Sequence, residues 1–362
     1  MKMKKPKKKI ILTVAILILV LLVGGFGLFS ASIYDQNINQ RYETYKPLML
    51  KVSDFEGLEA TSYEFPSDKG QILSGAMYKA GDDQKGIIIL AHGFGGGYNS
   101  YLDIINYFAQ NGYYVFAYDA TGNDESQGEG VGGFPQGLID LDYAISFVED
   151  SGNFPALPIG LFGHSWGAYS VSSVLSYHPE VKAVIACCGA NKSSDYFEAV
   201  GKKEAGDFIY TMMPFVKLHE RIKFGRYASN TSIDGFESSN AKVLLAHSED
   251  DQMIPISYGY NLFYEKYKDN PRFTFMHFED RGHNNFFVDP NNTYKDELDQ
   301  TIEKWAETLP YDYQAEENKE KFKKDKADFI EKNLDRQKWA NALDLKLFKK
   351  FLDFYDENLI SK

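Results

Sequence analysis

From about Gly70 onward, short apolar runs alternate with stretches of helical spacing. Several runs are apolar at every position, as in strands buried on both faces. The predicted strands are Ile72–Tyr78, Gly86–Ala91, Tyr113–Tyr118, Pro158–Phe162, Val181–Cys188, Lys242–Ala246 and Arg272–Phe278. The predicted helices are Ser100–Asn111, Gly137–Asp150, Trp166–Tyr177, Ile256–Lys268 and Tyr294–Thr308. This alternation predicts an α/β fold, with a mostly parallel sheet and helices on both faces.

Two segments interrupt the alternation. Residues from about 191 to 238 carry helical signals with many aromatic and Met side chains, which favours a helical lid inserted in the domain. An ordinary crossover with one long helix is the alternative. Residues 311–362 form a charged amphipathic tail, which predicts a C-terminal helical extension that packs against the main domain. Binding of a partner or of the membrane surface is the alternative for this tail.

The N-terminal segment is apolar and has no charge from Ile10 to Ile33. As a helix it would reach about 36 Å, enough to cross a hydrocarbon layer of about 30 Å. The lysines before it predict a cytoplasmic N-terminus and a body outside the cytoplasm. A signal peptide cleaved near Ala31 is the alternative. The chain thus divides into a basic tail and anchor (1–33), a main α/β domain (34–310) and the C-terminal extension (311–362).

Composition excludes several classes of protein. With 44% hydrophobic and 25% charged residues among 362, the chain is neither collagen-like nor wholly disordered. The net charge is −12, and six of the 39 Lys and Arg residues fall within the first nine positions. The remaining chain is strongly acidic, which argues against a nucleic-acid partner. The adjacent Cys187 and Cys188 predict small buried side chains and not a disulfide framework.

A Gly-x-Ser-x-Gly motif, Gly163 to Gly167, follows the predicted strand Pro158–Phe162 and precedes a predicted helix. A serine at such a turn is exposed at the sheet edge, and the two glycines let the strand and helix approach closely. This context predicts that Ser165 is a catalytic nucleophile.

A serine nucleophile needs a base, and the base needs an orienting acid. Of seven histidines, His283 follows the last predicted strand on a polar loop, so its position favours it as the base. The loop after the strand Lys242–Ala246 carries three adjacent acids, Glu249, Asp250 and Asp251, among which spacing alone does not choose. The order serine, acid, histidine is that of α/β-hydrolases.

Acyl transfer also requires donors for the oxyanion. The glycine-rich turn His92–Gly97 follows a predicted strand, and the backbone N–H groups of Phe94 and Trp166 are the predicted donors. A phosphate-binding function is disfavoured because no Gly-Lys-Ser/Thr follows these glycines. We expect no metal and no organic cofactor.

These motifs resemble the α/β-hydrolase family over roughly Gly70 to Leu309. The resemblance rests on His92–Gly96, Gly163–Gly167, Asp251–Pro255 and Gly282–His283. It implies that Asp251 is the triad acid and that Phe94 and Trp166 supply the oxyanion amides. The loop Asp119–Gly128 is similar to the family's Asp-x-Arg-Gly-x-Gly-x-Ser-x-Gly, but Thr121 and Asp124 replace the usual Arg and second Gly. The most similar groups are lid-bearing esterases, monoacylglycerol-lipase-like enzymes and serine aminopeptidases.

The sequence therefore predicts a membrane-tethered serine hydrolase outside the cytoplasm that cleaves an ester (or amide) bond through an acyl-enzyme, with Ser165, His283 and Asp251 as its triad. Its expected substrate is a small-molecule ester, a lipid or a peptide. The first alternative is an aminopeptidase, in which Glu198, Glu204 or Asp207 of the lid would hold the free amine. The second is a non-catalytic binding protein on the same scaffold. The sequence makes no prediction of the oligomeric state.

Overall fold

The structure is a computed structural model that describes residues 6–360. The N-terminal lysines used to orient the chain begin before this range, so Lys2, Lys4 and Lys5 lie outside the described residues.

One sheet forms the centre of the domain, with strands in the order β1-β2-β4-β3-β5-β6-β7-β8. The strands are β1 (Glu59–Pro66), β2 (Ile72–Lys79), β3 (Ile87–Ala91), β4 (Tyr114–Tyr118), β5 (Ile159–His164), β6 (Ala183–Cys187), β7 (Lys242–Ser248) and β8 (Phe273–Phe278). Strand β2 runs antiparallel to both of its neighbours, β1 and β4. The six strands β3 to β8 are mutually parallel. All seven predicted strands are present.

Strand β1 was not predicted from the sequence. Most of its residues are exposed, and Phe65 is its one buried apolar side chain. An edge strand of this kind has too few apolar positions to give a strand signal.

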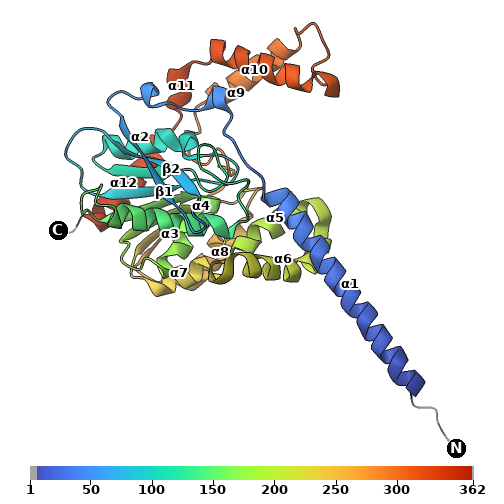
Figure 1. The fold of residues 1–362 in the computed structure, drawn as a ribbon. Helices are drawn as coiled ribbons and strands as arrows, with labels where there is room; N and C mark the ends of the chain where they lie inside the picture. The colour runs from blue at the N-terminus through green and yellow to red at the C-terminus, as the bar shows by residue number, and fades with distance from the viewer. Residues whose placement is uncertain (1–5, 361–362) are drawn as a thin grey trace, which may run out of the picture.

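Helices cover both faces of the sheet (Figure 1). Successive residues of β3 point to opposite faces, so Ile87 and Ile89 join one core and Ile88 and Leu90 join the other. The first core includes side chains of α3 (Pro135–Asp150), α4 (Trp166–Ser173), α7 (Ser232–Ser238) and α8 (Tyr260–Tyr267). The second includes those of α2 (Leu102–Gln110) and α12 (Leu345–Leu359). The predicted α/β architecture is therefore confirmed.

Helices also fill the segment between β6 and β7, which we call the cap (residues 191–238). It contains α5 (Ser193–Ala205), α6 (Ile209–Phe224) and α7. Helix α5 contacts the domain centre, because the Tyr196 hydroxyl donates a hydrogen bond of 2.7 Å to the carbonyl oxygen of Ser165.

Helix α1 (Pro6–Ile38) extends away from the domain (Figure 1). It is long and apolar enough over Lys9–Ile38 to cross a membrane, by length and composition alone. Its large apolar side chains from Ile10 to Val23 are exposed, whereas Tyr34 and Ile38 are buried where the helix meets the domain.

The segment after β8 divides into two parts. Helices α9 (Tyr294–Ala306), α10 (Lys319–Asn333) and α11 (Arg336–Ala340) lie at one side of the molecule (Figure 1), and Leu298, Ile302 and Ile330 form a small core between α9 and α10. Helix α12 instead packs on the central sheet, and the Tyr355 hydroxyl donates a 2.6 Å hydrogen bond to the carbonyl oxygen of Leu161 on β5. This helix is part of the main domain core.

Candidate active site

Ser165 lies at the turn between β5 and α4, as the motif predicts. Its backbone has φ 55° and ψ −118°, a strained conformation for a residue with a side chain. The turn is tight because Gly163 faces the backbone of Gly167, and Gly167 faces the carbonyl oxygen of Ala91 on β3. A Cβ at either glycine would clash with backbone, so both positions require glycine.

Three predicted residues meet at the carboxyl ends of the strands. His283 lies after β8 and Asp251 after β7. His283 Nε2 is 2.9 Å from Ser165 Oγ, and His283 Nδ1 is 2.7 Å from Asp251 Oδ2. All three residues are buried. The hydroxyl, the imidazole and the carboxylate therefore form one hydrogen-bonded chain.

The neighbouring acids lie elsewhere. Asp250 Oδ1 accepts hydrogen bonds from the Ser248 hydroxyl and from the Gly282 N–H, at 2.6 and 2.8 Å. Glu249 pairs with His277 on β8 at 3.0 Å. Of the three acids that the sequence leaves open, Asp251 alone contacts the His283 ring.

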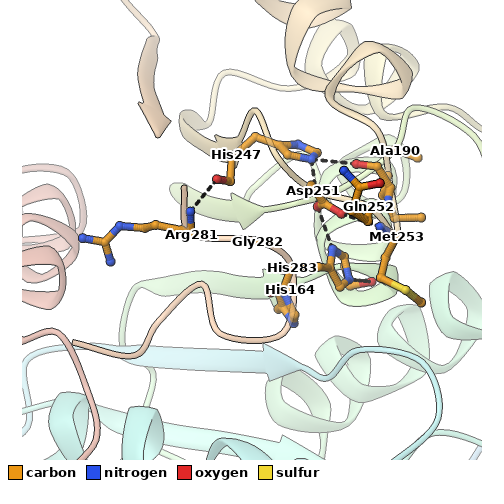
Figure 2. Close-up of polar contacts among 12 residues, drawn as sticks. His164, Ala190, His247, Asp251, Gln252, Met253, Arg281, Gly282 and His283 are labelled. Carbon is orange, nitrogen blue, oxygen red and sulfur yellow. Dashed lines mark hydrogen bonds and ion pairs between the residues drawn. The ribbon is translucent and has the colours of Figure 1, made fainter. Parts of the chain in front are cut away.

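A second histidine contacts Asp251, and the sequence analysis did not assign it a role. His247 Nε2, at the end of β7, is 3.1 Å from Asp251 Oδ2 and 2.9 Å from the carbonyl oxygen of Ile254. Since a carbonyl only accepts, this nitrogen carries the hydrogen. Figure 2 shows the carboxylate between the two imidazoles. The one feature of the sequence that could have indicated this contact is the four-residue spacing of His247 and Asp251 across the end of β7.

The charge of Asp251 is well stabilised. Burial would raise its pKa, but hydrogen bonds from His247 and His283 outweigh burial and hold the pKa well below its usual range. The N–H groups of Met253 and Ile254 also donate to Asp251 Oδ1, both at 2.8 Å. Asp251 is therefore ionised at neutral pH.

His164 precedes Ser165 in the chain, and its ring makes structural hydrogen bonds. Burial, together with the charge of His283, lowers its pKa to about 3. As a neutral ring it donates from Nε2 to the carbonyl oxygen of His283 at 3.2 Å, and its Nδ1 accepts from the Tyr101 hydroxyl at 2.9 Å. His164 thus ties the loop that carries His283 to β5.

The two predicted oxyanion donors flank the serine. The Trp166 N–H is at the first position of α4, and the Phe94 N–H is in the turn after β3. Within residues 6–360 neither amide donates a hydrogen bond. The rings of Phe94 and Trp166 pack edge to face, with centroids 5.4 Å apart, which holds the two segments together.

The loop after β4 differs from the family pattern in a defined way. Asp124 has φ 34°, in the region that glycine usually occupies, and its carboxylate accepts hydrogen bonds from the N–H and hydroxyl of Thr44 at 2.6 and 2.7 Å. Thr121 donates to the buried Asp140 through its N–H and its hydroxyl. Both replacements thus bind other parts of the chain to this loop.

A cavity of about 570 Å³ lies near these residues, and Ser165, Asp251 and His283 do not themselves line it. Its wall includes Gly95, His164 and Asn284, which are direct neighbours of Phe94, Ser165 and His283. The rest of the wall combines apolar and aromatic side chains with four charged ones. The first group includes Tyr45, Leu48, Leu50, Ile104, Phe287, Val288 and Trp339, and the charged residues are Glu43, Asp103, Lys295 and Lys338. The volume is in the range typical of pockets for small organic molecules.

Two groups of possible metal ligands overlap the site: His164, Cys188 and His283, and Cys188, His247 and Asp251. Burial raises the pKa of the Cys188 thiol well above its usual value, so the sulfur is protonated and is a poor ligand. The histidine and aspartate atoms are already engaged in hydrogen bonds to one another and to the protein.

Residues 82–256 match the family model described as serine aminopeptidase, S33. An uncharacterised protein of Bacillus subtilis, YqkD, is 27% identical over 219 residues, which cover 59% of this chain and 70% of that protein. Among solved structures, the esterase Pf2001 of Pyrococcus furiosus aligns with a TM-score of 0.52 at 18% identity, covering 75% of this chain and 97% of the esterase.

An acylaminoacyl peptidase of Pyrococcus horikoshii aligns with the same TM-score, 0.52, at 16% identity, covering 85% of this chain and 43% of the peptidase. An esterase and a peptidase thus share the fold equally, and the fold does not distinguish between these activities. The family match and the common architecture agree with the resemblance drawn from the motifs, and the chain has the α/β-hydrolase fold.

Proposed function

We propose that this chain is a membrane-anchored serine hydrolase that cleaves an ester bond outside the cytoplasm. The observation that carries the proposal is the hydrogen-bonded chain from Ser165 through His283 to Asp251, with distances of 2.9 and 2.7 Å. This is the arrangement that activates a serine for acyl transfer.

In the proposed mechanism Ser165 Oγ attacks the ester carbonyl while His283 Nε2 takes the hydroxyl proton. The N–H groups of Phe94 and Trp166 stabilise the oxyanion, and His283 returns the proton to the departing alcohol. Water then attacks the acyl-enzyme, again with His283 as the base, and releases the carboxylic acid and free Ser165. Asp251 holds the imidazole in the required tautomer and stabilises its protonated form.

The apolar part of the wall of the cavity near the triad supports an acyl or alkyl group as one half of the substrate. The aminopeptidase alternative is supported by the description of the matched family. None of its predicted amine-binding acids, Glu198, Glu204 and Asp207, lines this cavity. Two other acids, Glu43 and Asp103, do line it. Burial raises the pKa of Asp103 to about 7, so Glu43 is the acid of this wall that would hold the ammonium group of a peptide substrate.

The exposed apolar surface of α1 supports a membrane anchor, and the lysines before it support a cytoplasmic N-terminus. The uncharged run from Ile10 to Ile33 is longer than the roughly 7 to 15 apolar residues of a typical signal peptide. This length supports retention of the anchor over its removal.

The first test is reaction of the full chain with a fluorophosphonate probe. Ser165→Ala should abolish labelling and lower turnover by about 10⁶. Ser170→Ala is the matched control, because Ser170 is a buried serine of α4, the helix that begins just after Ser165, and its hydroxyl donates to the Trp166 carbonyl oxygen. Labelling of the Ser165→Ala variant would refute the assignment, and a folded native chain that resists the probe would favour the non-catalytic binding protein.

The second test separates the substrate classes. Rates should be compared on short-chain esters, long-chain monoacylglycerols and aminoacyl amides, because pocket length and amine recognition act directly on kcat/KM. We expect an ester to be preferred, and preference for the aminoacyl amides would establish the peptidase.

A further inference from the structure

Helix α6 of the cap exposes large apolar side chains beside the anchor helix. Leu218 and Ile222, one turn apart on α6, are 56% and 77% exposed, and Phe208 just before the helix is 51% exposed. Side chains of this size are costly to leave in water. Soluble proteins seldom gather them at one place without a partner.

These side chains continue the apolar surface of α1. The Phe26 ring packs edge to face on Phe208 and Phe215, with centroids 6.2 and 5.5 Å apart. A groove of about 590 Å³ runs between the two helices. Its wall is apolar except for His219, and consists of Leu19, Val20, Val23, Gly24, Gly27, Leu28 and Ala31 of α1 with Phe215, Leu218, His219 and Ile222 of α6.

The contact between α1 and α6 changes from polar to apolar toward the N-terminus of α1. At its polar end the Tyr34 hydroxyl donates a 2.5 Å hydrogen bond to Glu220, and Asp35 pairs with Lys223 at 3.0 Å and with His219 at 3.1 Å. At its apolar end Gly27 lies against the Phe215 ring. A transition of this kind is expected where a helix leaves the hydrocarbon and enters the interface.

The exposed charges of α6 and the turn after it are basic, whereas the segment just before Phe208 exposes two acids, Glu204 and Asp207. Between Ile209 and Ser229 the exposed charged residues are Lys217, Arg221 and Arg226, and the one acid, Glu220, is buried. Helices that lie in a membrane interface combine such basic residues with exposed apolar ones.

We propose that α6 rests in the interface of the bilayer that α1 crosses, with Leu218 and Ile222 among acyl chains and Lys217 and Arg221 against anionic headgroups. The proposal rests on the membrane-spanning role of α1. It adds a second membrane contact, made by the cap itself. The Tyr196 hydroxyl of the cap donates a hydrogen bond to the Ser165 carbonyl oxygen. The membrane contact of α6 would therefore place the bilayer surface next to the cap, which touches the candidate nucleophile.

The test uses the full-length chain in nanodiscs of phosphatidylcholine and phosphatidylglycerol that contain a lipid with a nitroxide on its acyl chain. A fluorophore is attached through Ile222→Cys on α6, Leu17→Cys on α1, or Ser151→Cys after α3. Cys187 and Cys188 are buried with no exposed surface, and the unsubstituted chain measures any labelling of them. We expect quenching at positions 222 and 17 and none at 151.

The outcomes separate the two proposals. Quenching at position 17 without quenching at 222 would overturn the cap contact and leave the anchor intact. Absence of quenching at both would overturn the anchor as well. Energy transfer between copies labelled at 222, without lipid quenching there, would mean that a second chain covers the groove and would also overturn the proposal.

A charge variant tests the headgroups. Lys217→Gln with Arg221→Gln should reduce quenching at position 222 in anionic nanodiscs, and the native pair should give less quenching in phosphatidylcholine alone. Lys182→Gln is the control, because Lys182 is an exposed lysine outside the cap. Equal quenching in both lipids, with and without the two basic residues, would overturn the electrostatic part of the proposal.

Discussion

The candidate active site and the contact between the cap and α1 each contain a buried carboxylate, and the two carboxylates differ in their ionisation at neutral pH. Asp251, between β7 and α8, is 3% exposed, and Glu220, between the cap and α1, is 1% exposed. The pKa of Asp251 is held low, whereas burial raises the pKa of Glu220 to about 7.

The difference lies in the donors. Asp251 accepts from two imidazoles and two backbone N–H groups, and an imidazole can itself become a cation. Glu220 accepts from two hydroxyls, those of Tyr34 and Ser193. Two hydroxyl donors offset less of the cost of a buried charge than two imidazole N–H and two backbone N–H donors. Burial alone therefore does not decide whether a carboxylate stays ionised.

The largest effect is expected from removing the charge at the candidate site. Asp251→Asn should lower kcat by about 10⁴, because a carboxamide neither fixes the His283 tautomer nor stabilises its protonated form. The measurement is steady-state hydrolysis of an ester substrate, together with the rate of labelling by a fluorophosphonate.

Asp250→Asn is the matched control. It changes a neighbouring acid that binds Ser248 and Gly282 and not the His283 ring, so its effect on kcat should be mild. The reverse ranking of the two variants would show that Asp251 is not the orienting acid.

A smaller effect should follow from removing one donor to Asp251. His247→Phe should lower kcat roughly 10- to 100-fold, the worth of one hydrogen bond to a charged group, and leave KM nearly unchanged. His247 acts here as a positioning residue, so His247→Gln, which retains an N–H donor, should restore part of the rate. Equal losses in both variants, or a change confined to KM, would contradict this role.

The smallest effect concerns stability at the other carboxylate. Glu220 has an ordinary pKa of 4.5 and a folded-state pKa of about 7, so the unfolded chain releases this proton first. Its contribution to the free energy of unfolding therefore falls as the pH rises from 4.5 to about 7. Glu220→Gln should remove this loss and gain up to about 3 kcal/mol relative to the native chain across that range.

Thermal unfolding of the detergent-solubilised chain at several pH values measures this difference. Glu204→Gln, at an exposed cap position, should leave the pH dependence as it is in the native chain. Parallel curves for the native chain and Glu220→Gln would show that Glu220 is ionised at neutral pH in the folded state, and the contrast with Asp251 would fail.

The sequence predicts most of the sheet because buried parallel strands are apolar at nearly every position, as in Ile87–Ala91. The same strands bring Ser165, Asp251 and His283 together, since the carboxyl ends of parallel strands share one edge. The catalytic roles of these three residues and of the two oxyanion amides stay predictions for the experiments above.

Other features depend on contacts that no local pattern encodes. The hydrogen bond of His247 to Asp251 depends on how the loop after β7 folds back. The packing of α1 on α6 joins Tyr34 to Glu220, 186 positions apart in the chain. Helical spacing indicated the helix α12, but its seat against Gly160 and Leu161 of β5 follows from the shape of the sheet.

The packing of α12 on the sheet has a consequence for folding during synthesis of the chain. Strands β3 to β6 are synthesised well before α12, yet α12 supplies much of the cover for one of their faces through Phe348, Phe351 and Tyr355. During vectorial synthesis Phe162 is covered only in part, by Phe108 of α2, until the later segments emerge. The nascent chain therefore exposes part of this apolar face between the synthesis of β6 and that of α12, and a holding chaperone would have its greatest benefit in this interval.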